Sequence, residues 1–170
     1  PNACCWMNKE RAGKRFMASR YRGYLPLRDS DKTRRLIRSA WYQERWGANV
    51  GALRDTALQS RKGQDVKSRF ENEHGGFRFS TAVSGIMGEG GDFVILDDPH
   101  NVEQAESEDN REDVVRRIRL ALPTRVRSPD GGVCVMMQRL HSRDYAGHMI
   151  ADKADLVHLC LPARYEKKHP

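Results

Sequence analysis

The chain has 170 residues, of which 38% are hydrophobic and 31% are charged, and its formal net charge is +7. This length is typical of one globular domain and excludes a multidomain assembly. The mean hydropathy is −0.77, and the sequence contains no apolar run near the roughly 20 residues that cross a bilayer, which argues against a membrane span and a secretory signal.

The basic residues are concentrated in the first third of the chain. Residues 1–62 contain fifteen Lys and Arg against five Asp and Glu, whereas the remainder contains fifteen against eighteen, so the two parts carry +10 and −3. This asymmetry favours a polyanion near the first third, although a solvated basic face would look the same. Because the chain begins with Pro1 rather than Met, we expect an internal fragment of a longer protein.

The four cysteines show neither the density of a disulfide scaffold nor the spacing of a zinc knuckle. Cys134 and Cys160 lie in apolar runs, where we expect reduced, buried side chains. This pattern implies a reducing cytoplasm.

In the first half of the chain we expect a short strand at residues 14–21 and a helix at residues 28–41. The apolar stripe of that helix is Leu36, Ile37 and Ala40, and basic residues cover its other faces. Residues 48–72 are polar and show no firm period. After the Gly75-Gly76 pair, residues 77–83 are predicted to form a strand.

The second half alternates strands with helices. A glycine-rich loop at residues 85–91 leads into a fully apolar strand at residues 93–96, followed by a helix at residues 104–122 that stops at a proline. The remaining predictions are a buried strand at 132–137, a helix at 143–151 and a strand at 156–161. This alternation indicates an α/β fold with helices on the faces of a sheet.

Two carboxylates follow the apolar strand at residues 93–96. Asp97 and Asp98 would therefore lie at the carboxyl edge of the sheet, where ligands bind in this class of fold. This is the arrangement of a Walker B element, in which one acid holds the water shell of Mg²⁺ and its neighbour orients or deprotonates the attacking water. Gln138 and Arg139 end the next strand and could sense the terminal phosphate at the same edge.

A phosphate-binding P-loop is missing from this sequence. Gly13-Lys14 lacks the required first glycine and the following Ser or Thr. The other glycine-rich segment, which contains Gly88, Gly90 and Gly91, lacks the lysine and precedes a strand rather than a helix. We expect this segment to form a flexible loop at the active edge, where its glycines are the candidate cofactor-binding residues.

Five segments, in order, resemble the large subunit of tailed-phage terminases. They are RDSDKTRRLIRSAWYQERWG (28–47), ENEHGGFRFSTAVSGIMGEGGDFVILDDPHN (71–101), AES with a following arginine (105–111), TRVRSPDGGVCVMMQRLHSRDYAGH (124–148) and HLCLPARYE (158–166). The resemblance spans nearly the whole chain. Met87 departs from the pattern, since many relatives are expected to have Thr-Gly at positions 87 and 88.

The resemblance implies part of a P-loop NTPase domain of the RecA-like, additional-strand class (ASCE), a three-layer sandwich with a mostly parallel central sheet. Residues 1–162 would be the partial ATPase domain and residues 163–170 the start of a linker. The P-loop would lie upstream and an RNase H-like nuclease downstream. By this resemblance Asp97 is the magnesium ligand, Asp98 is the adjacent catalytic acid, and Gln138-Arg139 is the coupling motif.

The implied function is an ATP-hydrolysing motor component that packages viral double-stranded DNA into procapsids in the host cytoplasm. ATP and Mg²⁺ would be its cofactors. Its partners would be the DNA, the portal protein, the small terminase subunit and further copies in a ring. Candidate DNA-contacting residues on the basic helix are Arg34, Arg35 and Arg38, which helical spacing allows to form one patch.

Two other functions compete with this interpretation. The first is a non-enzymatic nucleic-acid-binding domain in which arginines combine with stacking aromatic residues; these residues are Arg34, Arg35, Arg38, Arg45, Trp41, Tyr42 and Trp46. The second is a metal-dependent hydrolase, because histidine and carboxylate ligands suit a hydrolytic metal; its candidate ligands are Asp97, Asp98, His100 and His141.

Overall fold

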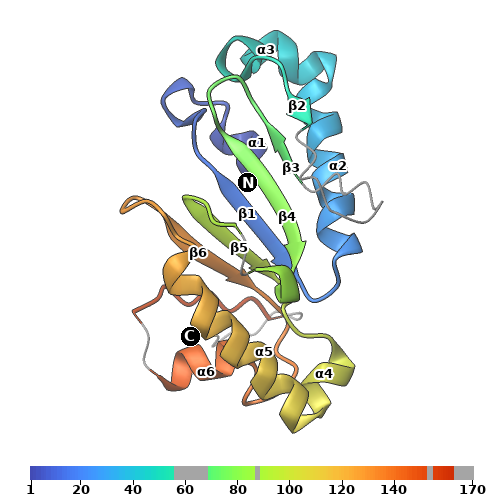
Figure 1. The fold of residues 1–170 in the computed structure, drawn as a ribbon, viewed down its shortest axis with the longest axis vertical. Coiled ribbons are helices and arrows are strands. Elements are labelled where there is room, and N and C mark those ends of the chain that lie inside the picture. Colours follow the sequence, from blue (N-terminus) through green and yellow to red (C-terminus); the bar gives the residue numbers. More distant parts are fainter. Residues whose placement is uncertain (56–68, 87–88, 153–154, 163–170) are drawn as a thin grey trace.

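The fold is α/β, built on one six-stranded mixed sheet (Figure 1). The computed structural model describes residues 1–55, 69–86, 89–152 and 155–162. The strand order is β2-β3-β4-β1-β5-β6, in which β4, β1, β5 and β6 are mutually parallel and β2 and β3 are antiparallel to their neighbours. The strands are β1 (Phe16–Arg20), β2 (Arg54–Asp55), β3 (Arg69–Glu71), β4 (Phe77–Ala82), β5 (Phe93–Asp97) and β6 (Gly132–Met136).

Helices cover both faces of the sheet. They are α1 (Asn2–Cys5), α2 (Tyr24–Arg38), α3 (Ala40–Val50), α4 (Val102–Glu106), α5 (Glu108–Ala121) and α6 (Tyr145–Ala151), with 3₁₀ turns at Lys9–Arg11, Val83–Gly85 and Leu122–Thr124. None of the helices in the described ranges has the length and apolar character that a membrane crossing requires.

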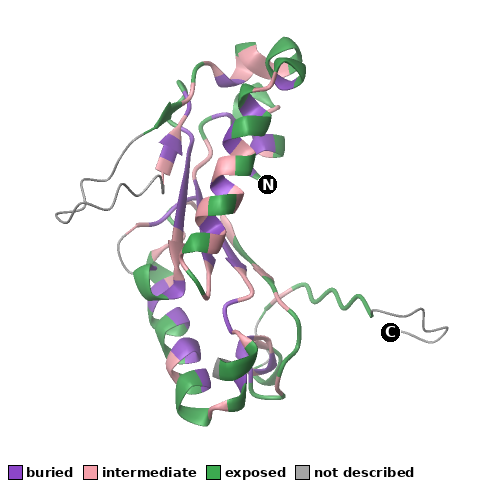
Figure 2. Cartoon of the chain, turned by 90° about the vertical axis from the view of Figure 1, so that its right-hand side faces the viewer, coloured by how far each residue is buried: buried purple, intermediate pink, exposed green. Residues whose placement is uncertain are grey.

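Two apolar clusters hold the layers together, one on each face of the sheet. Side chains of β1 point alternately into one cluster and the other. Met17 faces the cluster formed with α5 and α6, while Phe16 and Ala18 face the cluster formed with α1, α2 and α3. Successive residues of a strand point to opposite faces, so one central strand serves both halves of the core. In β5, Val94 and Leu96 join the first cluster and Ile95 joins the second. Figure 2 shows the buried parts of the chain, including much of the sheet, in purple.

The expected helix at residues 28–41 is present but differs in extent and orientation. It begins earlier, at Tyr24, and Ser39 ends it in an extended conformation; the Ser39 hydroxyl then accepts a hydrogen bond from the Tyr42 N–H and caps α3. The predicted apolar stripe is partly wrong, because Ile37 is fully buried whereas Leu36 is 43% exposed.

A serine also divides the expected helix at residues 104–122. The Ser107 hydroxyl accepts a hydrogen bond from the Asn110 N–H, so α5 starts anew after α4. The predicted strands at residues 14–21 and 77–83 are confirmed as β1 and β4. The short strands β2 and β3 were not expected. Both lie in the polar stretch at residues 48–72, and α3 ends in it at Val50. Residues 56–68 of this stretch are outside the described ranges.

The predictions at the β6 side of the sheet need two corrections. The strand at residues 132–137 is present as β6, but it is an edge strand with exposed positions rather than a buried one. Residues 156–161 form no strand, and Val157 is 99% exposed; in Figure 2 this segment extends away from the body of the protein. Cys134 and Cys160 are therefore both exposed, contrary to expectation. The expected linker at residues 163–170 lies outside the described residues.

Candidate functional site

The carboxyl ends of three parallel strands bring the candidate site together. β1 ends at Arg20, β5 ends at Asp97, and β6 leads through Met136 to Gln138. Because β5 lies between β1 and β6 in the sheet, residues far apart in the sequence meet at this edge.

The backbone of Asp98 is fixed in an uncommon conformation. Its φ is 45°, the only positive value at a non-glycine position in the described ranges. The Asp98 N–H donates to the Met136 carbonyl oxygen at 2.8 Å, and the Asp98 carbonyl oxygen accepts from the Tyr21 N–H at 3.2 Å. A left-handed residue costs on the order of 1 kcal/mol, and such residues are concentrated at functional sites. Hydrogen bonds from both flanking segments hold Asp98 in this conformation.

Arg20 is the central cation of the site, and sequence reasoning missed it. Its guanidinium contacts Asp97 at 3.1 Å, Asp98 at 3.1 Å and Asp29, near the start of α2, at 3.4 Å. The Arg20 side chain is only 17% exposed. The contact to Asp98 spans 78 residues of sequence, so only the pairing of β1 with β5 reveals it.

Of the three carboxylates around Arg20, that of Asp97 accepts the fewest hydrogen bonds. The Nη1 and Nη2 groups of Arg20 donate to Asp29 and Asp98, but Nε makes no hydrogen bond, although it lies 3.1 Å from Asp97 Oδ2. Within the described residues no donor forms a hydrogen bond to the Asp97 side chain. Burial raises the pKa of the Asp97 carboxyl above its usual value, against the lowering effect of Arg20.

This donor set fits a hard divalent cation such as Mg²⁺. Magnesium binds oxygen ligands, keeps several waters, and is commonly held by one or two carboxylates together with substrate phosphates. Asp97 offers a half-buried carboxylate that accepts no hydrogen bond from the described residues, and Asp98 lies beside it. Arg20 supplies the positive charge at these oxygens.

Gln138 and Arg139 occupy the same edge but in different roles. The Gln138 backbone N–H lies 3.4 Å from Asp98 Oδ1, so this residue meets the site through its main chain. Arg139 instead pairs with the buried carboxylate of Asp144 at 3.0 Å, and Asp144 caps α6 by accepting from the Gly147 N–H. Within the described residues Arg139 makes no contact with Asp97 or Asp98. Its guanidinium therefore stabilises the start of α6.

The candidate cofactor-binding glycines are not at this edge. Gly90 and Gly91 precede β5 and lie at its amino end, and Gly88 is outside the described residues. Gly91 donates to the Arg125 carbonyl oxygen at 2.9 Å, and a Cβ on Gly90 would lie 2.5 Å from that same oxygen. These glycines permit close packing of the loop that contains Arg125. The expectation of a glycine loop beside Asp97 and Asp98 is therefore wrong for Gly90 and Gly91.

A cavity of about 300 Å³ opens beside Asp98. Its lining includes Tyr21 and Arg22 after β1, His100, and Leu140 after β6. This volume is at the lower end of small-ligand pockets. A cleft thus adjoins the Asp98 carboxylate at the same edge of the sheet.

The histidines do not assemble the alternative metal site. His100 is 2% exposed, and its Nε2 accepts a hydrogen bond from the Tyr145 N–H at 3.1 Å. The Nδ1 atom of His141 accepts from the Arg143 N–H at 3.0 Å. The described ranges hold no group of three or more histidine, cysteine or acidic side chains that could bind a metal ion. Both histidines have ordinary structural hydrogen bonds.

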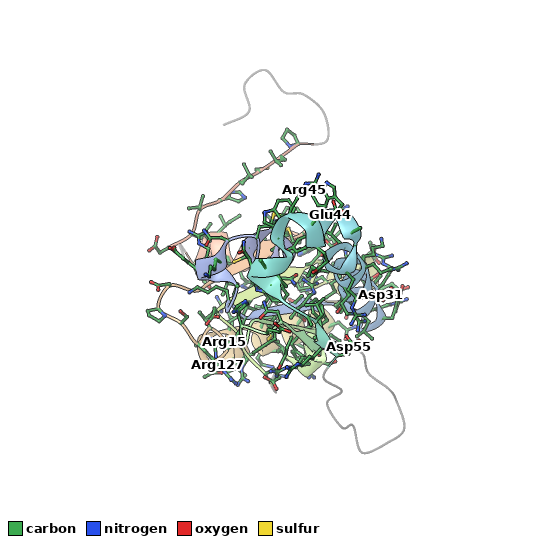
Figure 3. The ribbon with its side chains drawn as sticks, turned by 90° about the horizontal axis from the view of Figure 1, so that it is seen from above. Arg15, Asp31, Glu44, Arg45, Asp55 and Arg127 are labelled. Atoms are coloured by element: carbon green, nitrogen blue, oxygen red, sulfur yellow. The ribbon has the colours of Figure 1, made fainter. Side chains whose placement is uncertain are left out.

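The expected arginine patch on α2 is reduced to two residues. Arg34 has a side chain only 5% exposed, and it pairs with Asp55 at 2.9 Å, with its guanidinium 5.7 Å from the centre of the Phe70 ring. Arg35 and Arg38 are 72% and 51% exposed, and they pair with Asp31 and Asp55; both aspartates are labelled in Figure 3. The prediction that Arg34 faces DNA is therefore wrong.

Among the residues named for the nucleic-acid-binding alternative, one arginine–aromatic pair is exposed. The Arg45 guanidinium lies 5.2 Å from the centre of the Trp41 ring, and Trp41 is 49% exposed. Tyr42 is fully buried, where its hydroxyl donates to the Ala3 carbonyl oxygen at 2.7 Å. Trp46 packs against the second apolar cluster. Most of the aromatic group is therefore part of the core.

No protein-family model matches this chain, and no curated protein matches it.

Proposed function

We propose that this chain is part of the ATPase domain of a viral DNA-packaging motor, the part that carries the acidic Walker B element and the coupling segment. ATP and Mg²⁺ are its cofactors in this proposal. The P-loop and the nuclease belong to segments outside these 170 residues.

One observation supports the proposal most strongly. Two adjacent carboxylates, Asp97 and Asp98, follow a buried parallel strand at the carboxyl edge of the sheet, next to the Gln138 backbone after β6. Nucleotide-hydrolysing α/β proteins place their acidic residues at this position. The resemblance of the five sequence segments to terminases is the second support.

The residues divide the chemistry between them. Asp97, beside Asp98, would hold Mg²⁺, which when bound neutralises charge on the nucleotide phosphates. Asp98 is the residue proposed to orient or deprotonate the attacking water, and its backbone is held by hydrogen bonds from both neighbouring segments. The Gln138 N–H contacts the Asp98 carboxylate, so movement of the β6 loop would be transmitted directly to that group.

The proposal assigns the remaining partners by the same resemblance. Double-stranded DNA, the portal protein, the small terminase subunit and further copies in a ring would contact other surfaces. Of the three candidate arginines of α2, the exposed Arg35 and Arg38 are retained as candidates for DNA.

The test uses the protein extended to the start of its reading frame upstream of Pro1. That extension is expected to encode a strand followed by Gly-x-x-x-x-Gly-Lys-Ser/Thr. In the extended protein Asp98→Asn should reduce kcat by about 100-fold or more while ATP binding is retained, because the change removes a charged acid and leaves the phosphate contacts intact. The 170 residues alone should show no turnover above a no-protein control.

Asp109→Asn is the matched control, since Asp109 is an exposed residue of α5. It should leave both kcat and ATP binding unchanged. Full turnover in Asp98→Asn would assign Asp98 to structure, and an upstream frame without a P-loop would overturn the ATPase proposal.

A further inference from the structure

Arg20 places a positive charge where the proposed cation would bind. Its guanidinium lies 3.1 Å from oxygen atoms of both Asp97 and Asp98. Within the described residues no other cationic side chain forms an ion pair with either carboxylate. The side chain is mostly buried at the end of β1, so its charge is poorly screened by water.

The three contacts of Arg20 are not equivalent. Asp98 and Asp29 accept hydrogen bonds from Nη2 and Nη1, whereas Asp97 lies beside Nε without one. Asp97 is therefore the carboxylate that Arg20 contacts as an ion pair without a hydrogen bond. Asp29 belongs to α2 rather than to the strand ends, and it remains as a partner for the guanidinium if the other two carboxylates are taken.

We propose that Arg20 is a positioning residue that neutralises the Asp97–Asp98 pair, and that a divalent cation must displace its guanidinium from these carboxylates, with Asp29 retaining it. This inference rests on the proposed function, which makes the pair a cation site. A guanidinium and a divalent cation repel each other when they share the same oxygen atoms, so binding of one weakens binding of the other. Arginine suits this role because its planar fork reaches three carboxylates at once, which a lysine ammonium on its stem does not reproduce.

The test is a titration of the 170-residue chain with Mn²⁺ alone, followed by the electron paramagnetic resonance signal of the free ion. Arg20→Gln is expected to lower the Kd for Mn²⁺ by about tenfold or more, the scale on which a nearby charge shifts a proton equilibrium. Arg20→Lys keeps the charge but not the fork, and its Kd should lie between those of Arg20→Gln and the parent.

Arg28→Gln is the matched control for loss of one positive charge at this edge. Arg28 contacts Asp29 at 3.4 Å and is 53% exposed, and it does not touch Asp97 or Asp98. Its Kd for Mn²⁺ should stay within about twofold of the parent value, since exposed charges are screened. Adding Asp97→Ala to the Arg20→Gln chain should abolish the gain in affinity.

Circular dichroism and thermal unfolding without the ion check that each variant is folded. Arg20→Gln should melt at a lower temperature than the parent, because three carboxylates lose their shared cation, and Mn²⁺ should raise that temperature more than it does in the parent.

The charge-retaining Arg20→Lys variant keeps the test valid if Arg20→Gln does not fold. Tighter Mn²⁺ binding by Arg20→Lys than by the parent supports the proposal, and unchanged or weaker binding overturns it. Unchanged affinity in Arg20→Gln, with clear binding by the parent, overturns the competition and leaves the proposed cation site standing. Absence of binding in all variants overturns both.

Discussion

At the scale of single residues, the Asp92 carboxylate joins the start of β1 to the start of β5. It accepts from the Arg15 backbone N–H at 2.8 Å and pairs with the Arg15 guanidinium at 2.7 Å; Arg15 is labelled in Figure 3. Burial by itself would raise the pKa of Asp92, but the hydrogen bonds from Arg15 outweigh it and lower that pKa below its usual value. This carboxylate therefore stabilises the fold in its ionised form.

Asp92→Asn should lower the free energy of unfolding by about 2 kcal/mol at pH 7, the range for hydrogen bonds to a charged group. Since the pKa is lowered in the folded state, the contribution is complete above the unfolded pKa of about 3.9 and is lost as the pH falls through the folded value. Urea unfolding at pH 7 and at pH 3 should therefore show a smaller difference between parent and variant in acid. Asp130→Asn, in an exposed turn, is the control and should change little at either pH. A difference that is equal at both pH values would contradict this account.

Arg20 and Arg34 show which residue roles the sequence leaves open. Helical spacing correctly places Arg34 and Arg38 on one face of α2, and both contact Asp55. That spacing does not reveal that β2 and β3 cover the Arg34 end of this face. In the same way, Asp97 and Asp98 are predictable from the apolar strand before them, but their contact with Arg20 depends on strand order. Residue identity predicts the chemistry, and long-range pairing decides the partner.

At the scale of elements, α2 offers a direct comparison of two neighbouring aliphatic residues. Ile37 is fully buried in the cluster with Ala18 and Ile95, whereas Leu36 is 43% exposed. The sequence stripe contains both, because adjacent positions lie only about 100° apart around a helix. Packing alone distinguishes them.

Ile37→Ala should lower the free energy of unfolding by about 3 kcal/mol, because it leaves a cavity between α2 and the sheet. Leu36→Ala removes the same number of carbon atoms from the same helix and should cost less, about 1 kcal/mol, since 43% of the Leu36 surface stays exposed after folding. Urea unfolding of the two variants measures both values. Equal losses would mean that α2 presents a different face to the sheet.

The boundaries of the elements were harder to predict than their existence. The apolar run of β5 and the helical period of α5 are strong local patterns, and both elements form where expected. Ser39 and Ser107 end one helix and cap the next, which periodicity does not show because the apolar spacing continues across the break. Residues 156–161 are mostly apolar, like a buried strand, yet within the described residues nothing pairs with them. A strand forms only where a neighbour supplies its hydrogen bonds.

At the scale of the whole molecule, the alternation of strands and helices is enough to predict the α/β class but not the mixed sheet. β3 pairs antiparallel with both β2 and β4, and the sequence contrast between parallel and antiparallel strands is weak in segments this short. The net charge is a second property of the whole chain. Its excess lies in the first third, which includes the exposed side of α2 on the opposite face of the sheet from α5.

The charge distribution leads to the last prediction, which concerns duplex DNA. Arg35 and Arg38 are exposed, and their partners among the described residues are partly exposed aspartates. Such surface pairs contribute little stability, so both arginines can exchange these partners for phosphates. Each phosphate contact contributes about −0.9 to the slope of log affinity against log salt, so the double variant Arg35→Gln, Arg38→Gln should flatten the slope by about 2 and weaken binding equally for all sequences. Fluorescence anisotropy across a salt series measures the affinity and its salt slope.

The matched control is Arg116→Gln, Arg117→Gln on α5, whose arginines are 65% and 50% exposed and share Asp113. If the control flattens the slope as much, net charge alone attracts the DNA; if neither variant changes it, the arginines of α2 are an ordinary solvated face.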